Sequence, residues 1–168
     1  MSRDERIRND LEFYGSGILC SEEFRKSFRQ KHHIDTTVGE HTLYVSRTSL
    51  KIAYFLKKLH VKTNMGELVV AALCHDLGIL GRDEKYPNKR SCYRKHPGDS
   101  KEVARRLVPE LNERTEKMIE RHMFPVTIKP PVSKEGYILL AADKYCAVRE
   151  GARALRRALR TKKEKNKT

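Results

Sequence analysis

Residues 68–78 read LVVAALCHDLG, an apolar run that ends in a histidine–aspartate pair and a glycine. Leu68, Ala71 and His75 have the i, i+3, i+7 spacing of one helical face, which predicts that the histidine points into the core. Asp76 follows apolar residues of the same helix at three and four positions, so it is also expected to point inward. An unpaired buried carboxylate costs several kcal/mol, so the stretch predicts a positively charged partner.

Helical signals dominate the rest of the chain, and no alternating strand pattern, repeat or domain-splitting linker stands out. Capping residues mark the starts of the helices, and glycine or proline marks their ends. The expected helices cover 3–14, a stretch capped by Ser21, 37–59, 68–77, 96–109, 112–123 and a last stretch from Ser133 into the basic end. The glycines at 15 and 17 are expected to stop the first helix, and 81–95 to form a polar loop. The predicted fold class is all-α, with about five core helices after an N-terminal helical pair.

The length of 168 residues fits one domain with a sizeable core, which we place at 1–150. The formal net charge is +14 at pH 7, but half of this excess lies in residues 151–168, where eight Lys or Arg side chains oppose Glu164 alone. This end is predicted to be a solvated helix terminus and tail. Contact with nucleic acid or another anionic partner is the alternative.

The sequence indicates neither a membrane segment nor an oxidising compartment. Its apolar runs are shorter than the roughly 18 residues of a membrane span, and the polar start Met1–Arg6 lacks the apolar stretch of a secretory signal. Cys20, Cys74, Cys92 and Cys146 have no CxxC spacing, so we expect reduced thiols. The resulting prediction is a cytoplasmic protein without a membrane partner.

Ionisable residues recur on the apolar faces of other predicted helices. His41 and His122 are expected to lie on such faces. Asp143 comes after two leucines of the last helix, and His96 is expected to open a helix. A single inward histidine is more often a hydrogen-bonded core residue, so the combination carries the argument. No Lys or Arg shares these faces, which makes a metal ion the convenient counter-charge for two buried carboxylates. Imidazole and carboxylate together suit a borderline or hard divalent ion.

The order of these residues resembles the HD superfamily of metal-dependent phosphohydrolases. The matching set, within about 33–150, is His41, His75-Asp76, His96, His122 and Asp143. It is similar to the form with two extra histidines that holds two metals, as in HD-GYP phosphodiesterases and diadenosine-tetraphosphate hydrolases. The stretches 33–37, 121–125 and 143–147 more closely resemble an uncharacterised group of bacterial HD-domain hydrolases.

This resemblance implies two divalent ions, drawn from Fe, Mn, Zn, Ni, Co and Mg. The implied ligands are His41, His75, Asp76 and Asp143 for one ion, and His96 and His122, with Asp76 bridging, for the other. A hydroxide bridging the two ions would attack phosphorus in line, because metal binding lowers the pKa of water to roughly 7. HD-GYP enzymes carry a lysine where this chain has Ile79, and the chain lacks a Gly-Tyr-Pro tripeptide. Cyclic di-GMP is therefore disfavoured as a substrate.

Several cations and one further histidine are candidates for substrate contacts. Arg82 and Lys144 lie near the ligands in sequence and are the preferred catalytic partners of Asp76, and His33 and Lys95 are substrate-binding candidates. A solvated surface role is the alternative for each of them. The predicted function is hydrolysis of a phosphate ester or anhydride. The expected substrate is a small molecule, namely a nucleotide. The competing interpretation is a non-catalytic HD module that binds nucleotides or nucleic acid, and the pattern indicates no oligomeric state.

Overall fold

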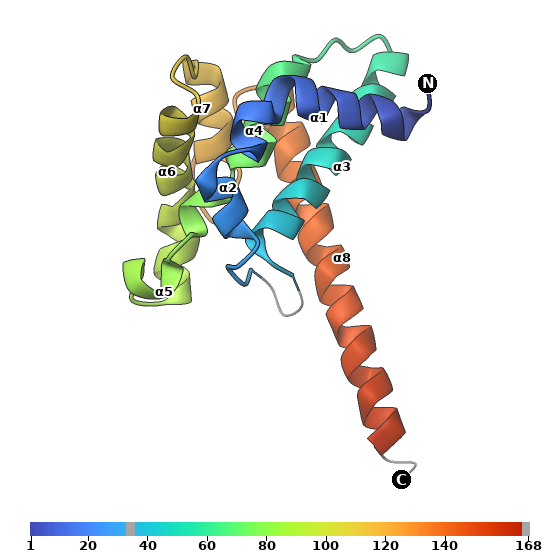
Figure 1. The fold of residues 1–168 in the computed structure, drawn as a ribbon, viewed down its shortest axis with the longest axis vertical. Helices are drawn as coiled ribbons and strands as arrows, with labels where there is room; N and C mark the ends of the chain where they lie inside the picture. Colours follow the sequence, from blue (N-terminus) through green and yellow to red (C-terminus); the bar gives the residue numbers. More distant parts are fainter. Residues whose placement is uncertain (33–35, 166–168) are drawn as a thin grey trace.

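The computed structural model describes residues 1–32 and 36–165, and in these ranges the chain is helical apart from loops and an isolated bridge between Lys31 and Thr37 (Figure 1). The elements are α1 (Arg3–Leu19), α2 (Glu22–Ser27), α3 (Val38–Lys58), α4 (Met65–Cys74), the 3-10 turn η1 (Leu77–Ile79), α5 (Arg82–Lys85), α6 (Lys89–Leu107), α7 (Glu113–Glu120) and α8 (Lys134–Lys165). The all-α prediction is confirmed. Its N-terminal pair is α1 and α2, and the five core helices are α3, α4, α6, α7 and α8.

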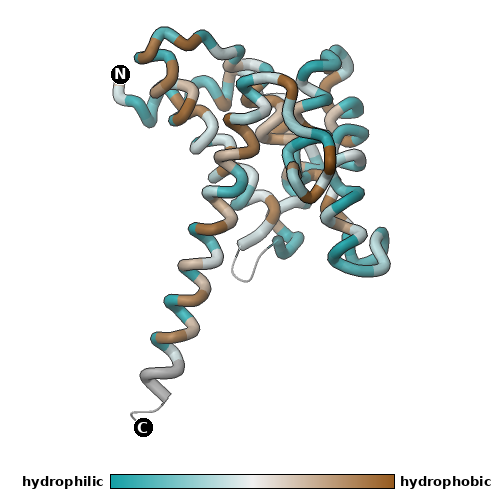
Figure 2. Tube along the Cα trace, turned by 180° about the vertical axis from the view of Figure 1, so that it is seen from behind, coloured by the Kyte–Doolittle hydropathy of each residue, from teal (hydrophilic) through white to brown (hydrophobic). Residues whose placement is uncertain are grey.

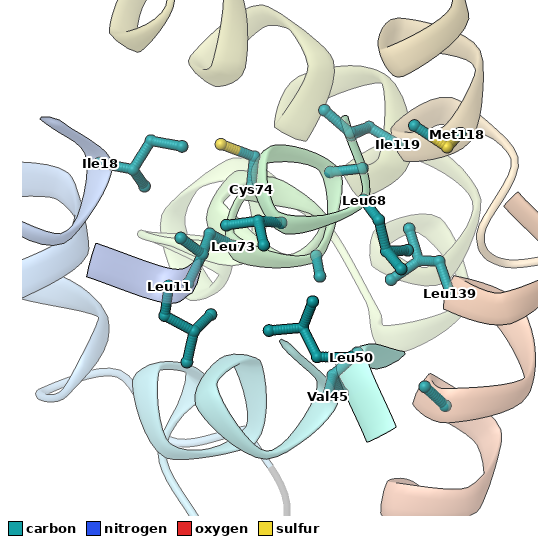
Figure 3. Close-up of a cluster of buried hydrophobic side chains, with 14 of the residues drawn as sticks. Leu11, Ile18, Val45, Leu50, Leu68, Leu73, Cys74, Met118, Ile119 and Leu139 are labelled. Atoms are coloured by element: carbon teal, nitrogen blue, oxygen red, sulfur yellow. The ribbon is translucent and has the colours of Figure 1, made fainter. Parts of the chain in front are cut away.

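The helix α4 lies at the centre of this bundle. Its residues from Leu68 to Cys74 are buried almost throughout. Figure 3 shows apolar side chains converging on it, including Leu11 from α1, Val45 from α3, Ile119 from α7 and Leu139 from α8. A helix that is apolar on all sides is stable only when neighbours cover it on all sides. This cover fixes the position of the end of α4, where the His75–Asp76 pair begins.

The predicted end of the first helix at Tyr14 is wrong, because α1 continues to Leu19. Gly15 faces α4 instead of forming a turn. A Cβ atom at this position would lie 2.4 Å from Cδ1 of Leu73 and 3.3 Å from Cγ1 of Val69. This glycine, which the sequence suggested was a helix stop, therefore permits close packing of α1 on α4.

The predicted helix over 68–77 also ends earlier than expected. α4 ends at Cys74, His75 is its C-cap, and the chain enters the tighter turn η1 at Leu77. His75 and Asp76 therefore lie at the break between two elements. A continuous α-helix would point consecutive side chains about 100° apart. The break removes this constraint, so both side chains reach the same cluster in the core.

The prediction of a polar loop over 81–95 is wrong for most of its length. α5 covers Arg82–Lys85, and α6 begins at Lys89, where the side chain of Asn88 accepts a hydrogen bond from the backbone N–H of Ser91 at 2.8 Å. The dipeptide His96-Pro97 consequently lies inside α6 and does not open it. The first turns of α6 were missed because Cys92 is the one buried residue between Lys89 and Lys95, so no hydrophobic periodicity marks these turns.

Side-chain caps begin several of the helices, as the sequence indicated. Ser21, Thr37, Asn64 and Asn112 each accept a hydrogen bond from a backbone N–H three residues later. Thr37 also forms a reciprocal capping box with Glu40 at the start of α3. The last predicted cap is confirmed as well, because the Ser133 hydroxyl accepts from the N–H of Gly136.

The helix α8 extends beyond the bundle (Figure 1). Glu150 and Ala154 are its last buried residues, and the following residues are exposed as far as Thr161. Apolar and polar residues alternate along this projecting part, as the view from behind shows (Figure 2). The predicted boundary at residue 150 falls within this continuous helix, and the separation of a domain from a tail there stays a prediction.

The cysteines and the apolar character of the helices can be compared with the sequence analysis. The four cysteines are free thiols, with Cys20 exposed and Cys74, Cys92 and Cys146 buried, as predicted. Among the helices described over 1–32 and 36–165, none is long and apolar enough to cross a membrane.

A buried carboxylate joins the starts of α4 and α8 to α7. Glu135 is fully buried, accepts a hydrogen bond of 2.9 Å from the backbone N–H of Asn64, and forms an ion pair with Arg114. Burial alone would raise the pKa of Glu135, but these hydrogen bonds outweigh it and lower the pKa below its usual value of 4.5. Glu135 therefore stabilises the fold in its ionised form.

Glu135→Gln should lower the free energy of unfolding by about 1–2 kcal/mol at pH 7, because it removes a charged hydrogen-bond acceptor whose partner Arg114 is partly exposed. The folded-state pKa is lowered, so this contribution is present above the unfolded value and is lost as the pH falls below it. Urea unfolding of metal-free protein at pH 7 and pH 3.5 measures the difference. Glu113→Gln, which removes only an exposed ion pair with Lys117, is the control and should change little at either pH. An equal loss of stability for Glu135→Gln at both pH values would contradict this prediction.

Candidate metal centre

The six side chains that the sequence singled out as metal ligands meet at one place in the bundle. They come from α3, from the break between α4 and η1, from α6, from the turn after α7 and from α8: His41, His75, Asp76, His96, His122 and Asp143. Each is at most 6% exposed. Helices distant in sequence thus bring four imidazoles and two carboxylates into one buried cluster, and their role as ligands stays a prediction.

The carboxylate of Asp76 divides the cluster into two sides. Its Oδ1 atom lies 3.2 Å from Nε2 of His96 and 3.4 Å from Nε2 of His122, and these two Nε2 atoms are 3.1 Å apart. Two atoms that bind one ion at about 2.1 Å lie about 3.0–3.4 Å apart at octahedral to tetrahedral angles. The three atoms on the Oδ1 side therefore have the spacing of ligands to a common ion.

The Oδ2 side of Asp76 holds the remaining predicted ligands. Oδ2 lies 3.5 Å from Nε2 of His75 and 3.8 Å from Nε2 of His41. Oδ1 of Asp143 lies 3.0 Å from the same His41 atom and 3.9 Å from that of His75. These separations are slightly wider than on the other side but stay within the range of one coordination shell, so a second group of donors faces the opposite oxygen of the same carboxylate.

Hydrogen bonds fix which nitrogen of each ring faces the cluster. Nδ1 of His75, His96 and His122 lies 2.7–2.9 Å from the backbone carbonyls of Ala72, Cys92 and Ile119. A carbonyl only accepts, so each Nδ1 carries the proton and donates it. The lone pair of each neutral ring is then on Nε2 and points into the cluster, which is the tautomer that a metal ligand requires.

Two contacts in the cluster fit a bound cation. Nε2 of His75 is fully buried and makes no hydrogen bond, although a buried polar atom without a partner is costly. Nε2 of His96 faces Nε2 of His122 at 3.1 Å, and two lone pairs at this distance repel each other unless one ring is protonated or a cation lies between them. Both observations favour a metal ion as the missing partner, and the donor set of imidazole and carboxylate suits a divalent one.

Protons and metal ions compete for these side chains. Burial would lower the pKa of His41, but hydrogen bonds to Asp143 and Glu150 outweigh it and raise the pKa to about 10. For His96, burial is likewise outweighed by Asp76, and the pKa rises to about 9. Burial dominates at His75 and lowers its pKa to about 4. The carboxyl pKa values of Asp76 and Asp143 are held low by the surrounding imidazoles, despite their burial. Without metal, protonated histidines therefore supply the counter-charge.

Glu150 orients the first histidine and was missed in the sequence. Its carboxylate lies 3.0 Å from Nδ1 of His41 and accepts a hydrogen bond from the Thr36 hydroxyl at 3.1 Å. A carboxylate behind a ligating histidine fixes the ring and raises its basicity. Glu150 follows Asp143 by seven residues, or two helical turns, so the spacing within α8 was the signal that would have found it.

His32 also reaches the cluster, although it is not among the predicted ligands. Its Nε2 atom lies 3.4 Å from Oδ2 of Asp76. It precedes α3 in a stretch without helical periodicity, so no face could be assigned to it from the sequence. The neighbouring candidate His33 lies outside the described residues.

A cleft of about 570 Å³ adjoins the cluster, and His32 belongs to both. The cleft is lined by Lys31, His32, Arg82, Asp83, Tyr86, Pro87, Asn88, Lys89, Cys92 and Tyr93. Arg82, a predicted catalytic residue, lines it and donates a hydrogen bond of 3.3 Å to the backbone carbonyl of His32. Lys144 lies apart from this cleft but at the edge of the cluster, where its ammonium group is 3.2 Å from Oδ2 of Asp143. Lys95 is exposed and lines no part of the cleft.

The family model of the HD domain matches residues 38–148. The chain therefore belongs to the HD-domain family, whose members are usually metal-dependent phosphohydrolases. The matched range contains all six predicted ligands. No curated protein and no solved structure matches the chain.

The backbone of η1 touches that of α6 at Gly78, between Asp76 and His96. A Cβ atom here would lie 2.4 Å from the backbone nitrogen of Ser100 and 2.5 Å from the carbonyl oxygen of His96. These are backbone atoms of a helix, so a side chain has no room unless α6 moves. Glycine at this position therefore holds Asp76 and His96 within reach of each other.

Gly78→Ala should destabilise the fold by about 2 kcal/mol or more, because overpacking forces a backbone shift, and it should weaken metal binding on the Oδ1 side of Asp76. Thermal unfolding and metal analysis of the purified variant measure both effects. Gly98→Ala in the same helix is the control, since a Cβ atom there meets nothing within 4 Å and alanine favours helices. Equal stability and metal content of the two variants would show that the close approach at Gly78 has no role.

Proposed function

We propose that the chain is a metal-dependent phosphohydrolase that acts on a phosphate ester or anhydride of a nucleotide. The observation that carries this proposal is a buried cluster of Nε2 and carboxylate donors directly beside a cleft lined by cations. Clefts of this size with a few convergent polar groups are typical of small-molecule sites. A purely structural metal site is more often closed and cysteine-containing, whereas no cysteine among the described residues belongs to this cluster.

The chain would hold two divalent ions, with Asp76 contributing one oxygen to each. The proposed ligands are His41, His75, Asp76 and Asp143 on one side and Asp76, His96 and His122 on the other. When bound, such ions lower the pKa of water to roughly 7 and neutralise charge on phosphoryl oxygens. This set of imidazole and carboxylate donors is compatible with Fe, Mn, Zn, Ni, Co and Mg.

The cations of the cleft would bind and orient the phosphate. Lys31, Arg82 and Lys89 line its wall, and the guanidinium group of Arg82 is suited to paired hydrogen bonds with phosphate oxygens. The ammonium group of Lys144 neutralises part of the charge of Asp143 and stays within reach of a substrate at the cluster. His33 and Lys95 remain substrate-binding candidates.

One exposed tyrosine of the cleft supports a nucleotide as the substrate class. Tyr93 is 46% exposed and lines the cleft, so its ring is available to a nucleobase. The hydroxyl of Tyr86 donates to the backbone carbonyl of Gly78 at 3.0 Å, which anchors this wall of the cleft to η1. A phosphate near the cluster and a base on Tyr93 would together occupy the cleft.

Purified protein loaded with each candidate metal should hydrolyse at least one nucleotide or phosphate ester in a screen of such compounds. Asp76→Ala should then reduce turnover by at least about 100-fold and lower the metal content, because one carboxylate serves both ions. Phosphate release and metal analysis are the two measurements. Glu110→Ala, which removes an exposed carboxylate between α6 and α7, is the control and should keep both near the wild-type values. Near-normal turnover of Asp76→Ala would refute the proposed bridge.

The second candidate function, a nucleic-acid-binding module, is favoured by one observation. Beyond Glu150, the described residues of α8 up to Thr161 are exposed apart from Ala154, and they present Arg153, Arg156, Arg157 and Arg160. A basic helix of this kind binds phosphate backbones through screened, long-range attraction. It contains no predicted ligand, so the two candidate functions make different predictions about its removal.

Deleting residues 159–168 should leave kcat/KM for a small substrate within about threefold, while weakening any binding to RNA or DNA and its dependence on salt. Steady-state kinetics and fluorescence anisotropy with labelled oligonucleotides at two salt concentrations measure these effects. Tight oligonucleotide binding that is weakened by the deletion, in a protein without phosphohydrolase activity, would favour the binding module over the enzyme.

A further inference from the structure

His32 is held at the cluster by its backbone. Its N–H donates to the carbonyl of Thr36 at 2.9 Å, its own carbonyl accepts from Arg82 at 3.3 Å, and the preceding Lys31 bridges to Thr37. These contacts tie the residue to the start of α3 and to α5. The position of the imidazole is thus set by two elements of the fold and not by the side chain alone.

The imidazole of His32 points at the same carboxylate oxygen as two predicted ligands. Its Nε2 atom lies 3.4 Å from Oδ2 of Asp76, close to the 3.5 Å of His75 and shorter than the 3.8 Å of His41. The ring centres of His32 and His41 are 4.4 Å apart. His32, His41 and Asp76 also form a group whose donor atoms all lie within 4.8 Å of one another. His32 is thus as close to Oδ2 of Asp76 as His75 is, and closer than His41.

We infer that His32 is a seventh protein ligand, which binds the ion on the Oδ2 side of Asp76. The inference rests on the metal centre of the proposed function and extends its six-residue ligand set. The side chain of His32 is 10% exposed, and a neutral imidazole in such a position is a common ligand for divalent transition metals. No other described residue that lines the cleft offers an imidazole.

The seventh ligand makes the two ions unequal. On the Oδ2 side the protein would supply five donors: His32, His41, His75, Asp76 and Asp143. On the Oδ1 side it would supply three: Asp76, His96 and His122. Divalent transition metals accept four to six ligands, so the first ion has little room for further ligands and the second has several open positions. The first ion is therefore assigned to structure and charge, and the second to exchange of solvent and substrate oxygens.

This assignment also links the metal to the cleft. His32 is part of the cleft wall, and Arg82, a proposed phosphate-binding residue, donates to its carbonyl. An ion bound on the Oδ2 side would hold His32, and through it would fix the position of Arg82. Metal binding at the tighter site is thus expected to organise the surface on which the substrate lies.

The test is metal binding by His32→Ala, measured without any substrate. Full-length protein, stripped of metal, is titrated with Zn²⁺ and with Co²⁺ against a competing chelator, and the Co²⁺ absorption spectrum is recorded at one and two equivalents. Loss of a direct ligand should weaken one of the two ions by at least about tenfold, since even partners behind the ligands contribute 10–100-fold. The other ion should change less than about threefold, and the spectrum of the tighter ion should change shape.

Two further variants make the result decisive. His60→Asn removes an exposed histidine far from the cluster and keeps the positive φ of 60° that asparagine tolerates, so it should bind both ions as the wild type does. His32→Gln keeps a polar side chain of similar length, and it replaces His32→Ala if circular dichroism shows that the alanine variant is unfolded.

The possible results separate the inference from the proposed function. Selective weakening of one ion in the His32 variants supports the seventh ligand. Wild-type affinities for both ions and an unchanged Co²⁺ spectrum overturn it, while leaving the six-ligand centre intact. Failure of the wild-type protein to bind any of the metals overturns the metal centre and this inference with it.

Discussion

The carboxylate of Asp76 is buried at the end of a helix that is itself enclosed on all sides, and the site is arranged around this one charge. An ionised carboxylate in such a place is stable only with positive partners and hydrogen bonds. Each of its oxygens faces imidazoles, His96 and His122 on one side and His41 and the neighbouring His75 on the other. The bundle must therefore bring three separate segments, those of His41, His96 and His122, to the end of α4 before this carboxylate is neutralised, which ties folding to formation of the cluster.

In this arrangement the stability of the fold is coupled to whether protons or metal ions neutralise the carboxylates. Without metal, raised pKa values at His41 and His96 let protons neutralise the carboxylates. A divalent ion bound in their place would favour the folded chain over the unfolded one and would also stabilise the fold. The close contact at Gly78 and the carboxylate of Glu150 keep the donors in place for either partner. The same buried charges that cost free energy in the core would thus provide the binding energy for an ion.

The sequence predicted the all-α class, the helix caps and the six clustered side chains, because each depends on local spacing or on burial of charge. It did not predict the helical turns before His96, because Cys92 is the one buried residue in these turns and leaves no apolar periodicity. Gly15 looked like a helix stop because the sequence does not show which helix packs against it. His32 approaches Asp76 through loop contacts that have no period. The features that could not be predicted therefore depend on tertiary contacts, which no single segment of the sequence reveals.

The hydrogen bonds at Nδ1 have a kinetic consequence. His75, His96 and His122 each donate to a carbonyl only three or four residues earlier, within the same turn of chain. These bonds are local to each turn, so they set the tautomer of each neutral ring without any contact from another helix. An arriving ion would meet Nε2 lone pairs that already face it, and no proton would have to move from one ring nitrogen to the other first.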